Sequence, residues 1–192
     1  MQRLTPHVRL ILVGLVASAV LAAAANGATD GSAGLLAPSG TCPGGDLADA
    51  PTSDEMQAMS CLVDYVRAHA GLPALRSSTR LDHAAMLKID ADVRCGQFSH
   101  TPCGASFLTV FSAAGYITAG GAFAVGENLA FGQGWRGSPR QVMAMWLHSP
   151  EHLRNLLSTQ WHDFGLGVRR RVDLQGVHGV TIWANEFGAH TG

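Results

Sequence analysis

The sequence predicts an α+β domain in which helices come first and an antiparallel sheet is formed by strands near the C-terminal end. Apolar residues recur every three or four positions through residues 52–66 and 80–94, and again after Pro139, which is the helical period. Residues 164–168 and 180–184 alternate and are rich in β-branched side chains, and a turn is expected at residues 173–176 between them. Helices followed by strands are typical of the α+β class.

The composition indicates one globular protein and excludes several classes of function. The chain has 192 residues, of which 47% are hydrophobic and 14% are charged, so it is able to form an apolar core. Its 13 Lys and Arg residues nearly balance 14 Asp and Glu residues, and the formal net charge is −1. A protein that binds nucleic acid by neutralising phosphates carries a basic surplus, so no nucleic-acid partner is expected.

The N-terminal residues 1–25 are predicted to be a secretory signal peptide. Arg3 and Arg9 precede an uncharged apolar run from Leu10 to Ala25, which ends in small residues suited to cleavage. The alternative is a membrane anchor, but this run is shorter than the roughly 20 residues that span a bilayer. We therefore expect a secreted or cell-envelope protein with no stable membrane span after cleavage.

The first half of the exported chain is expected to hold a linker and three helices. Residues 26–52 are mostly Gly, Ala, Ser, Thr, Pro and Asp and are predicted to form a flexible linker before a domain at 53–190. Thr52 followed by Glu55 has the form of a capping box that opens the first helix. Gly71 and Pro73 end this helix, and further helices are expected at 80–94 and 106–114.

Two Ser-Pro pairs predict the starts of two more helices in the second half. Ser138-Pro139 and Ser149-Pro150 each place a capping residue before a proline at the first helical position. The tryptophans are expected in the core, with the exception of Trp135, which lies among glycines on a predicted exposed loop.

Four cysteines remain in the exported part of the chain and predict two disulfides. An even number of cysteines outside the cytosol favours disulfides, and four cysteines allow three connectivities. We predict the sequence-local pairs Cys42–Cys61 and Cys95–Cys103. A structural zinc site is the alternative, but the closely spaced pairs typical of such sites are missing from the sequence.

Several short motifs, in a fixed order, resemble those of the CAP superfamily (cysteine-rich secretory proteins, antigen 5, pathogenesis-related 1) in its compact bacterial SCP-like form. The resemblance covers about residues 55–188 and rests on the following segments: Tyr65-x-Arg67-x-x-x-Gly71-Leu72-Pro73-x-Leu75, Phe98-Ser99-His100, Gly126-Glu127-Asn128-Leu129, Ser149-Pro150-Glu151-His152 with Asn155-Leu156-Leu157, and Trp183-Ala184-Asn185-Glu186-Phe187-Gly188.

This resemblance implies an α–β–α sandwich with a central antiparallel sheet and a cleft where two histidines and acidic residues converge. Matched motif by motif, the cleft residues are His100, Glu127 and His152. Larger relatives add a second glutamate soon after the first histidine, whereas residues 101–114 contain no Asp or Glu here. The expected site is therefore reduced to three residues.

Three interpretations of these residues remain open. His100 and His152, with Glu127, are able to hold a zinc-like cation, and we expect weak binding because structural zinc prefers four ligands. Alternatively, Glu127 hydrogen-bonds one histidine and fixes its tautomer. The third interpretation is a polar cluster that only stabilises the fold.

The function expected from the sequence is that of a secreted, non-catalytic binding module that takes a small ligand or a cell-envelope component, with or without a divalent cation. The alternative is a metal-dependent hydrolase with His100 and His152 as ligands and Glu127 as general base. Against it, the sequence contains neither an H-E-x-x-H nor a G-x-S-x-G motif. A structural envelope protein with a vestigial cleft is a third possibility.

Overall fold

The computed structural model describes residues 34–118 and 120–191. The predicted signal peptide, residues 1–25, and the first part of the predicted linker therefore lie outside the described residues.

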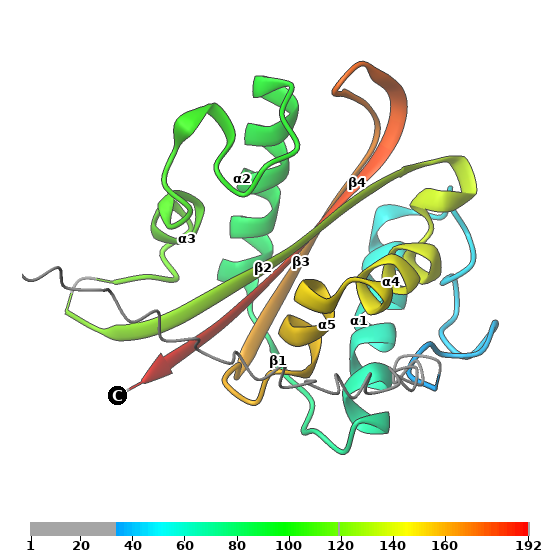
Figure 1. The fold of residues 1–192 in the computed structure, drawn as a ribbon, viewed down its shortest axis with the longest axis horizontal. Helices are drawn as coiled ribbons and strands as arrows, with labels where there is room; N and C mark the ends of the chain where they lie inside the picture. The colour runs from blue at the N-terminus through cyan, green and yellow to red at the C-terminus, as the bar shows by residue number, and fades with distance from the viewer. Residues whose placement is uncertain (1–33, 119, 192) are drawn as a thin grey trace, which may run out of the picture. The chain divides into compact units, whose positions relative to one another are not determined.

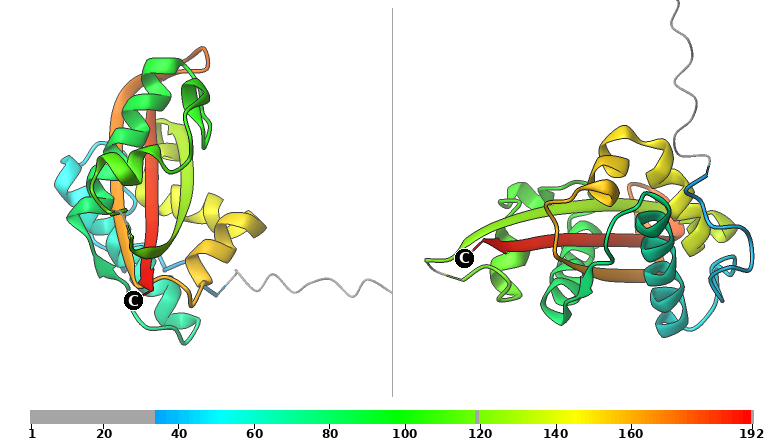
Figure 2. Two further views of the ribbon diagram at one scale, coloured as in Figure 1. Left: turned by 90° about the vertical axis from the view of Figure 1, so that its left-hand side faces the viewer. Right: turned by 90° about the horizontal axis from the view of Figure 1, so that it is seen from below.

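A four-stranded sheet forms the centre of the domain (Figure 1). Its strands are β1 (Arg76–Ser77), β2 (Ala122–Gln133), β3 (Asp163–Leu174) and β4 (Val177–Thr191), in the order β1-β3-β4-β2. The three long strands are antiparallel, as predicted, and the short β1 adds a parallel pairing with β3 at the edge. Figure 2 shows the three long strands side by side in two further views.

The predicted turn between the last two strands is a tight hairpin. Gln175 and Gly176 connect β3 to β4, and both have positive φ angles, 51° and 77°. Two consecutive positive φ values suit the right-handed twist of a hairpin, which explains the glycine at the second position.

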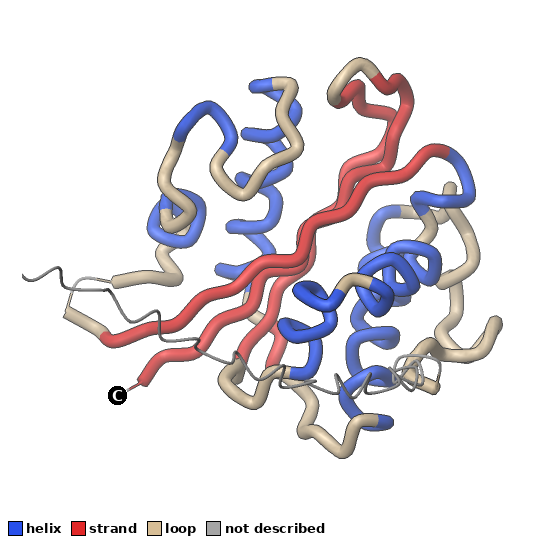
Figure 3. Tube along the Cα trace, viewed as in Figure 1, coloured by secondary structure: helices blue, strands red, loops and turns tan. Residues whose placement is uncertain are grey.

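Helices cover both faces of the sheet, which gives the three layers that the family resemblance implies (Figure 3). Helices α1 (Thr52–His69), α4 (Pro139–His148) and α5 (Pro150–Leu157) lie on one face, and α2 (Thr79–Cys95) and α3 (Thr109–Ala113) lie on the other. Trp146 and Trp183 are fully buried in the core on the α1 side, and Trp135 is 62% exposed in the short 3-10 helix Gly134–Gly137.

Helix α2 lies directly on the sheet because β3 carries glycines beneath it. A Cβ atom at Gly165 would lie 2.2 Å from the backbone carbon of Leu81, and one at Gly167 would lie 2.9 Å from that of Ala85. Only glycine permits this approach. It brings the polar residues on the inner face of α2 against the sheet.

The capping box predicted at Thr52 and Glu55 is wrong. Pro51 is the N-cap of α1, without a side-chain hydrogen bond, and Glu55 is fully buried against the domain. Ser78, by contrast, caps α2 by accepting a hydrogen bond from the N–H of Leu81 at 3.4 Å.

Residues 34–51, which the composition assigns to a flexible linker, pack against the domain. Leu35, Ala37 and Cys42 are buried in the main core, and Cys42 forms a disulfide with Cys61 in α1. Arg140 also donates from Nε to the carbonyl oxygen of Ala37 at 2.9 Å. The small residues of this segment allow the close packing, and the disulfide adds the constraint that the composition alone does not reveal.

Candidate functional site

His100 lies in a short loop that the second predicted disulfide closes. Cys95 ends α2, and Cys103 lies in a 3-10 helix at Pro102–Gly104, with a Cα–Cα distance of 5.7 Å across the disulfide. Inside the loop, the amide of Cys103 donates to the side-chain oxygen of Gln97 at 2.7 Å. The His100 side chain is 56% exposed, so this restricted loop presents an accessible imidazole.

Glu127 holds the orientation of His100. Its Oε1 lies 2.5 Å from His100 Nδ1, and its own side chain is only 1% exposed in the middle of β2. This hydrogen bond is the largest cause that raises the pKa of His100, and burial partly opposes it. With Nδ1 bonded to the carboxylate, Nε2 is the nitrogen left to meet a ligand or a cation.

A buried lysine lies beneath the loop. Lys88 Nζ lies 3.5 Å from Asp92 Oδ1 and 3.8 Å from Glu127 Oε1, and it also donates to the carbonyl oxygen of Ser99. Asp92 accepts from the amide of Ser99 at 3.4 Å. The side chains of Lys88 and Asp92 are almost wholly buried, so this ion pair anchors the histidine loop to α2.

A third acidic residue, Glu186, completes the buried cluster. It is fully buried and lies opposite Glu127 in the pairing of β4 with β2. Burial, followed by the charge and the hydrogen bond of Glu127, raises the pKa of Glu186 well above its usual range. Burial also raises the pKa of Asp92 to about 6. The sequence analysis does not identify Glu186 as a neighbour of Glu127, although Glu186 belongs to the quoted Trp183–Gly188 motif.

His152 lies on α5 and lines a different pocket from His100. Its backbone carbonyl accepts from Asn128 Nδ2 at 3.1 Å, and the Asn155 side chain donates to the Glu127 carbonyl at 3.0 Å. Burial is the main cause that lowers the pKa of His152, and the charge of His100 contributes. The structure therefore joins His100 to Glu127 directly, and it brings His152 into electrostatic range.

Two pockets flank this group of residues. The first, about 270 Å³, lies between α2, α3 and the disulfide-closed loop, and its walls are mainly apolar. Its lining includes Leu87, Ala91, His100, Phe107 and Val110. The second, about 220 Å³, is lined by His152 together with aromatic residues that include Phe98, Phe131 and Trp146.

The possible metal ligands around His100 are few. Within the part of the chain that the structure describes, no group of three or more His, Cys, Asp or Glu side chains is arranged to hold a metal ion. Glu127 directs its carboxylate to His100 Nδ1, in the arrangement by which a carboxylate commonly orients a histidine ligand.

Comparison with known proteins identifies the family. The model of the cysteine-rich secretory protein (CAP) family matches residues 62–183, which is more than half of the chain. The chain belongs to the CAP family. No curated protein matches the chain.

Solved structures share this CAP fold. An outer surface protein of Borrelia burgdorferi is 19% identical with a TM-score of 0.59, and the match covers 73% of this chain and 96% of that one. An extracellular protein of Bacillus anthracis that contains an SCP domain is 21% identical with a TM-score of 0.54, covering 72% of this chain and 44% of that one. A cysteine-rich secretory protein of Staphylococcus aureus is 16% identical with a TM-score of 0.54, covering 71% and 40%. The CAP chain thus spans less than half of the last two proteins.

Among the residues that the structure describes, this CAP domain has no helix that is both long and apolar enough to cross a bilayer.

Proposed function

We propose that this protein is an exported, non-catalytic binding module that takes a small ligand in the apolar pocket beside His100. The observation that carries the proposal is the His100–Glu127 hydrogen bond at the wall of a 270 Å³ pocket lined mainly by apolar groups. Such a combination of apolar walls and one oriented polar group is typical of small-molecule sites. The two disulfides and the extracellular or surface descriptions of the structural neighbours support export.

The pocket proposal is tested with a small apolar probe. We expect indole, followed by amide NMR shifts, to perturb Ala91 and Val110, because both line the pocket. Ala91→Leu fills the pocket and should abolish these shifts. Ala68→Leu, at an exposed position of α1, is the matched control and should leave them unchanged. Shifts that persist in Ala91→Leu would place indole elsewhere and contradict the proposal.

A divalent cation is a further part of the proposal. His100 Nε2 and His152 would supply two neutral imidazoles, so we expect zinc to bind weakly, with affinity falling as pH drops below about 6.5. Calorimetric titration with zinc at pH 6 and pH 7.5 measures this. Binding that is unchanged in the His100→Ala, His152→Ala double variant would place the cation elsewhere. Nanomolar affinity would require another ligand, and His148 and His162 would be substituted first.

The metal-dependent hydrolase is the less favoured function. A general base must reach the proton that it removes, whereas Glu127 is 1% exposed and is already bonded to His100. We therefore expect no cleavage of an unfolded protein substrate. Robust cleavage that Glu127→Gln abolishes would support the hydrolase instead.

A further inference from the structure

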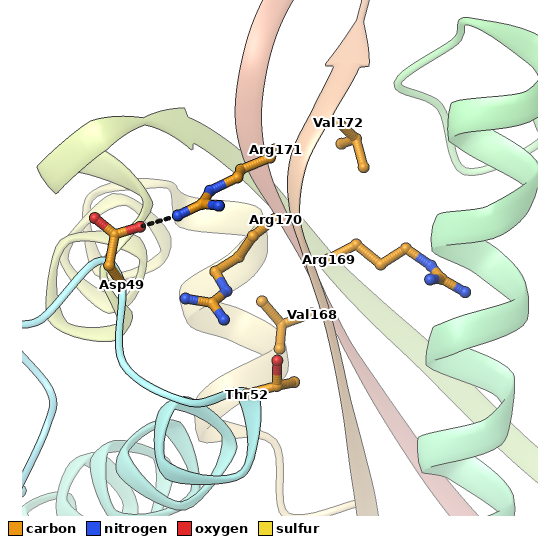
Figure 4. Close-up of a pocket in the computed structure, with 7 residues that line it drawn as sticks. All are labelled: Asp49, Thr52, Val168, Arg169, Arg170, Arg171 and Val172. Atoms are coloured by element: carbon orange, nitrogen blue, oxygen red, sulfur yellow. Dashed lines mark ion pairs between the residues drawn. The ribbon is translucent and has the colours of Figure 1, made fainter.

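Three consecutive arginines, Arg169–Arg171, lie near the end of β3. A β-bulge at this point directs the side chain of Arg169 away from those of Arg170 and Arg171. The pairing of β3 with β4 shifts register between Arg169 and Val172, and Arg171 has a positive φ of 56°. In a regular strand, consecutive side chains alternate between faces. The extra residue breaks this alternation, so Arg170 and Arg171 extend toward the same side, while Arg169 extends toward α2 (Figure 4).

Arg169 has a different partner from Arg170 and Arg171. Arg169 forms a two-contact ion pair with Asp90 on α2, at 2.5 and 3.0 Å. Arg171 has only a 3.9 Å contact with Asp49, and both side chains are about four-fifths exposed, at 83% and 79%. Neither guanidinium of Arg170 and Arg171 forms a hydrogen bond to any residue that the structure describes. Within these described residues, their N–H donors are therefore not used in hydrogen bonds, although Arg170 is also in ion-pair range of Glu55.

These two arginines line a pocket of about 460 Å³ at the start of α1. Thr52, the first residue of α1, is part of the lining, and no side chain caps this end of the 18-residue helix. The N–H groups of Asp54 and Glu55 both donate to the carbonyl oxygen of Pro51, so within the first turn the N–H groups of Thr52 and Ser53 are left without a helical partner and carry partial positive charge. The pocket thus combines two guanidinium groups with a helix terminus of the same sign.

A buried carboxyl lies beside Arg170. Glu55 Oε2 is 3.6 Å from Arg170 Nε, the Glu55 side chain is fully buried, and neither of its oxygens has a hydrogen-bond partner in the described part of the chain. Burial, the largest effect, raises the pKa of Glu55 to about 7, Arg170 lowers it, and the charge of Asp49 raises it. Glu55 is therefore partly protonated at neutral pH and cancels the positive charge only in part.

We propose that Arg170 and Arg171, together with Thr52 at the start of α1, bind a tetrahedral oxyanion, a phosphate or sulfate group. Guanidinium groups match such anions with paired N–H donors, and helix termini add further donors. The anion replaces the long contact between Asp49 and Arg171. This site is formed by residues of α1 and β3, separate from the pocket beside His100, so it stands independently of the function proposed above.

Titration of the purified protein with sodium sulfate at constant ionic strength tests the site. Sulfate keeps its charge between pH 6 and pH 8, so changes in affinity report the protein. We expect saturable shifts of the Thr52, Arg170 and Arg171 amides, and roughly tenfold weaker binding in Arg171→Gln. Arg169→Gln is the matched control, because it removes the same charge from the neighbouring residue that is paired with Asp90. Equal losses in the two variants, or shifts that do not saturate, would overturn the proposal.

Glu55 provides a second readout. An anion beside Arg170 favours protonated Glu55, so sulfate should bind more tightly as pH falls from 8 to 6. Glu55→Gln should give tight sulfate binding at pH 8 and remove the pH dependence of the affinity. A pH dependence that persists in this variant would contradict binding of the anion beside Arg170. Arg170→Gln should weaken sulfate binding as Arg171→Gln does. If Arg170→Gln fails to fold because Glu55 is left buried without its partner, the Arg170→Gln, Glu55→Gln double variant is measured against Glu55→Gln instead.

Inorganic phosphate and phenyl phosphate distinguish the two sources of the anion. Tighter binding of phenyl phosphate assigns the site to a phosphate group carried by an organic molecule, and equal binding assigns it to the free anion. Either result supports the oxyanion site, and failure of sulfate and both phosphates to bind would overturn it.

Discussion

Glu186 on β4 lies directly opposite Glu127 on β2, both residues are buried, and Glu127 lies 3.8 Å from Lys88 Nζ. Two carboxylates that lie opposite each other in a buried site repel each other strongly, so one of them retains its proton. Burial and the charge of Glu127 raise the pKa of Glu186, which identifies Glu186 as the protonated partner. Glu127 is thereby left to bond His100.

Glu186→Gln should be tolerated. An amide has nearly the shape of a protonated carboxyl and is also uncharged, so we expect the free energy of unfolding to change by less than about 1 kcal/mol. Glu186→Ala leaves a buried void and should lower the free energy of unfolding by about 2–4 kcal/mol. Urea unfolding at pH 7 measures both variants. Equal losses would show that Glu186 is ionised in the folded protein.

Lys88→Met should be strongly destabilising. Lys88 is the cation beside Asp92 and Glu127, and removal of one partner of a buried ion pair lowers stability by about 3–5 kcal/mol. Arg94→Met, at an exposed position near the end of the same helix, is the control and should change stability little. Similar midpoints of urea unfolding for the two variants would contradict the role assigned to Lys88.

Glu127→Gln should lower the pKa of His100. The hydrogen bond that Glu127 accepts from His100 is the largest cause that raises this pKa, so its loss leaves burial, which acts in the opposite direction. Because the charge of His100 lowers the pKa of His152, the His152 midpoint should rise slightly in the same variant. Histidine ring NMR signals followed from pH 5 to pH 8 give both midpoints. Glu151→Gln serves as a control that should affect His152 alone, and an unchanged His100 midpoint in Glu127→Gln would exclude the bond.

Glu55→Gln should change how stability depends on pH. The pKa of Glu55 is raised from 4.5 to about 7, so the folded protein binds the proton more tightly than the unfolded chain. This contribution to stability is present below pH 4.5 and is lost as pH rises through about 7. The variant should therefore flatten the decline between pH 5 and pH 7 and be more stable than the parent at pH 8. Urea unfolding at these pH values measures the slope, with the exposed neighbour Asp54→Asn as control. An identical decline in the parent and in Glu55→Gln would assign it to other groups.

The sequence predicts much of this fold because periodicity reports which face of an element is buried. It locates α2 within one residue at each end, and it finds the β3–β4 turn and both disulfides. It misses β2, since Gly126, Glu127 and Asn128 have low strand propensity and are held in place by pairing with β4. Tertiary contacts decide that segment.

The candidate site is likewise predicted in part from local motifs and decided in part by tertiary contacts. The motifs single out His100 and Glu127, and the structure joins them. The neighbours Lys88, Asp92 and Glu186 depend on how α2 lies over the sheet and on the register between β2 and β4, which local patterns do not reveal. The spacing of Glu55 from Thr52 predicts a capping residue, but the burial of Glu55 next to Arg170 comes from the packing of α1 on β3.

The position of Lys88 also allows local unfolding to be measured by chemical labelling of this one side chain. The sequence contains no other lysine, and this one is 1% exposed under the histidine loop. An amine-reactive label can reach its Nζ only in molecules whose α2 has separated from the sheet. The rate of labelling at Lys88, read by peptide mass spectrometry, would therefore count openings of this region without any engineered probe.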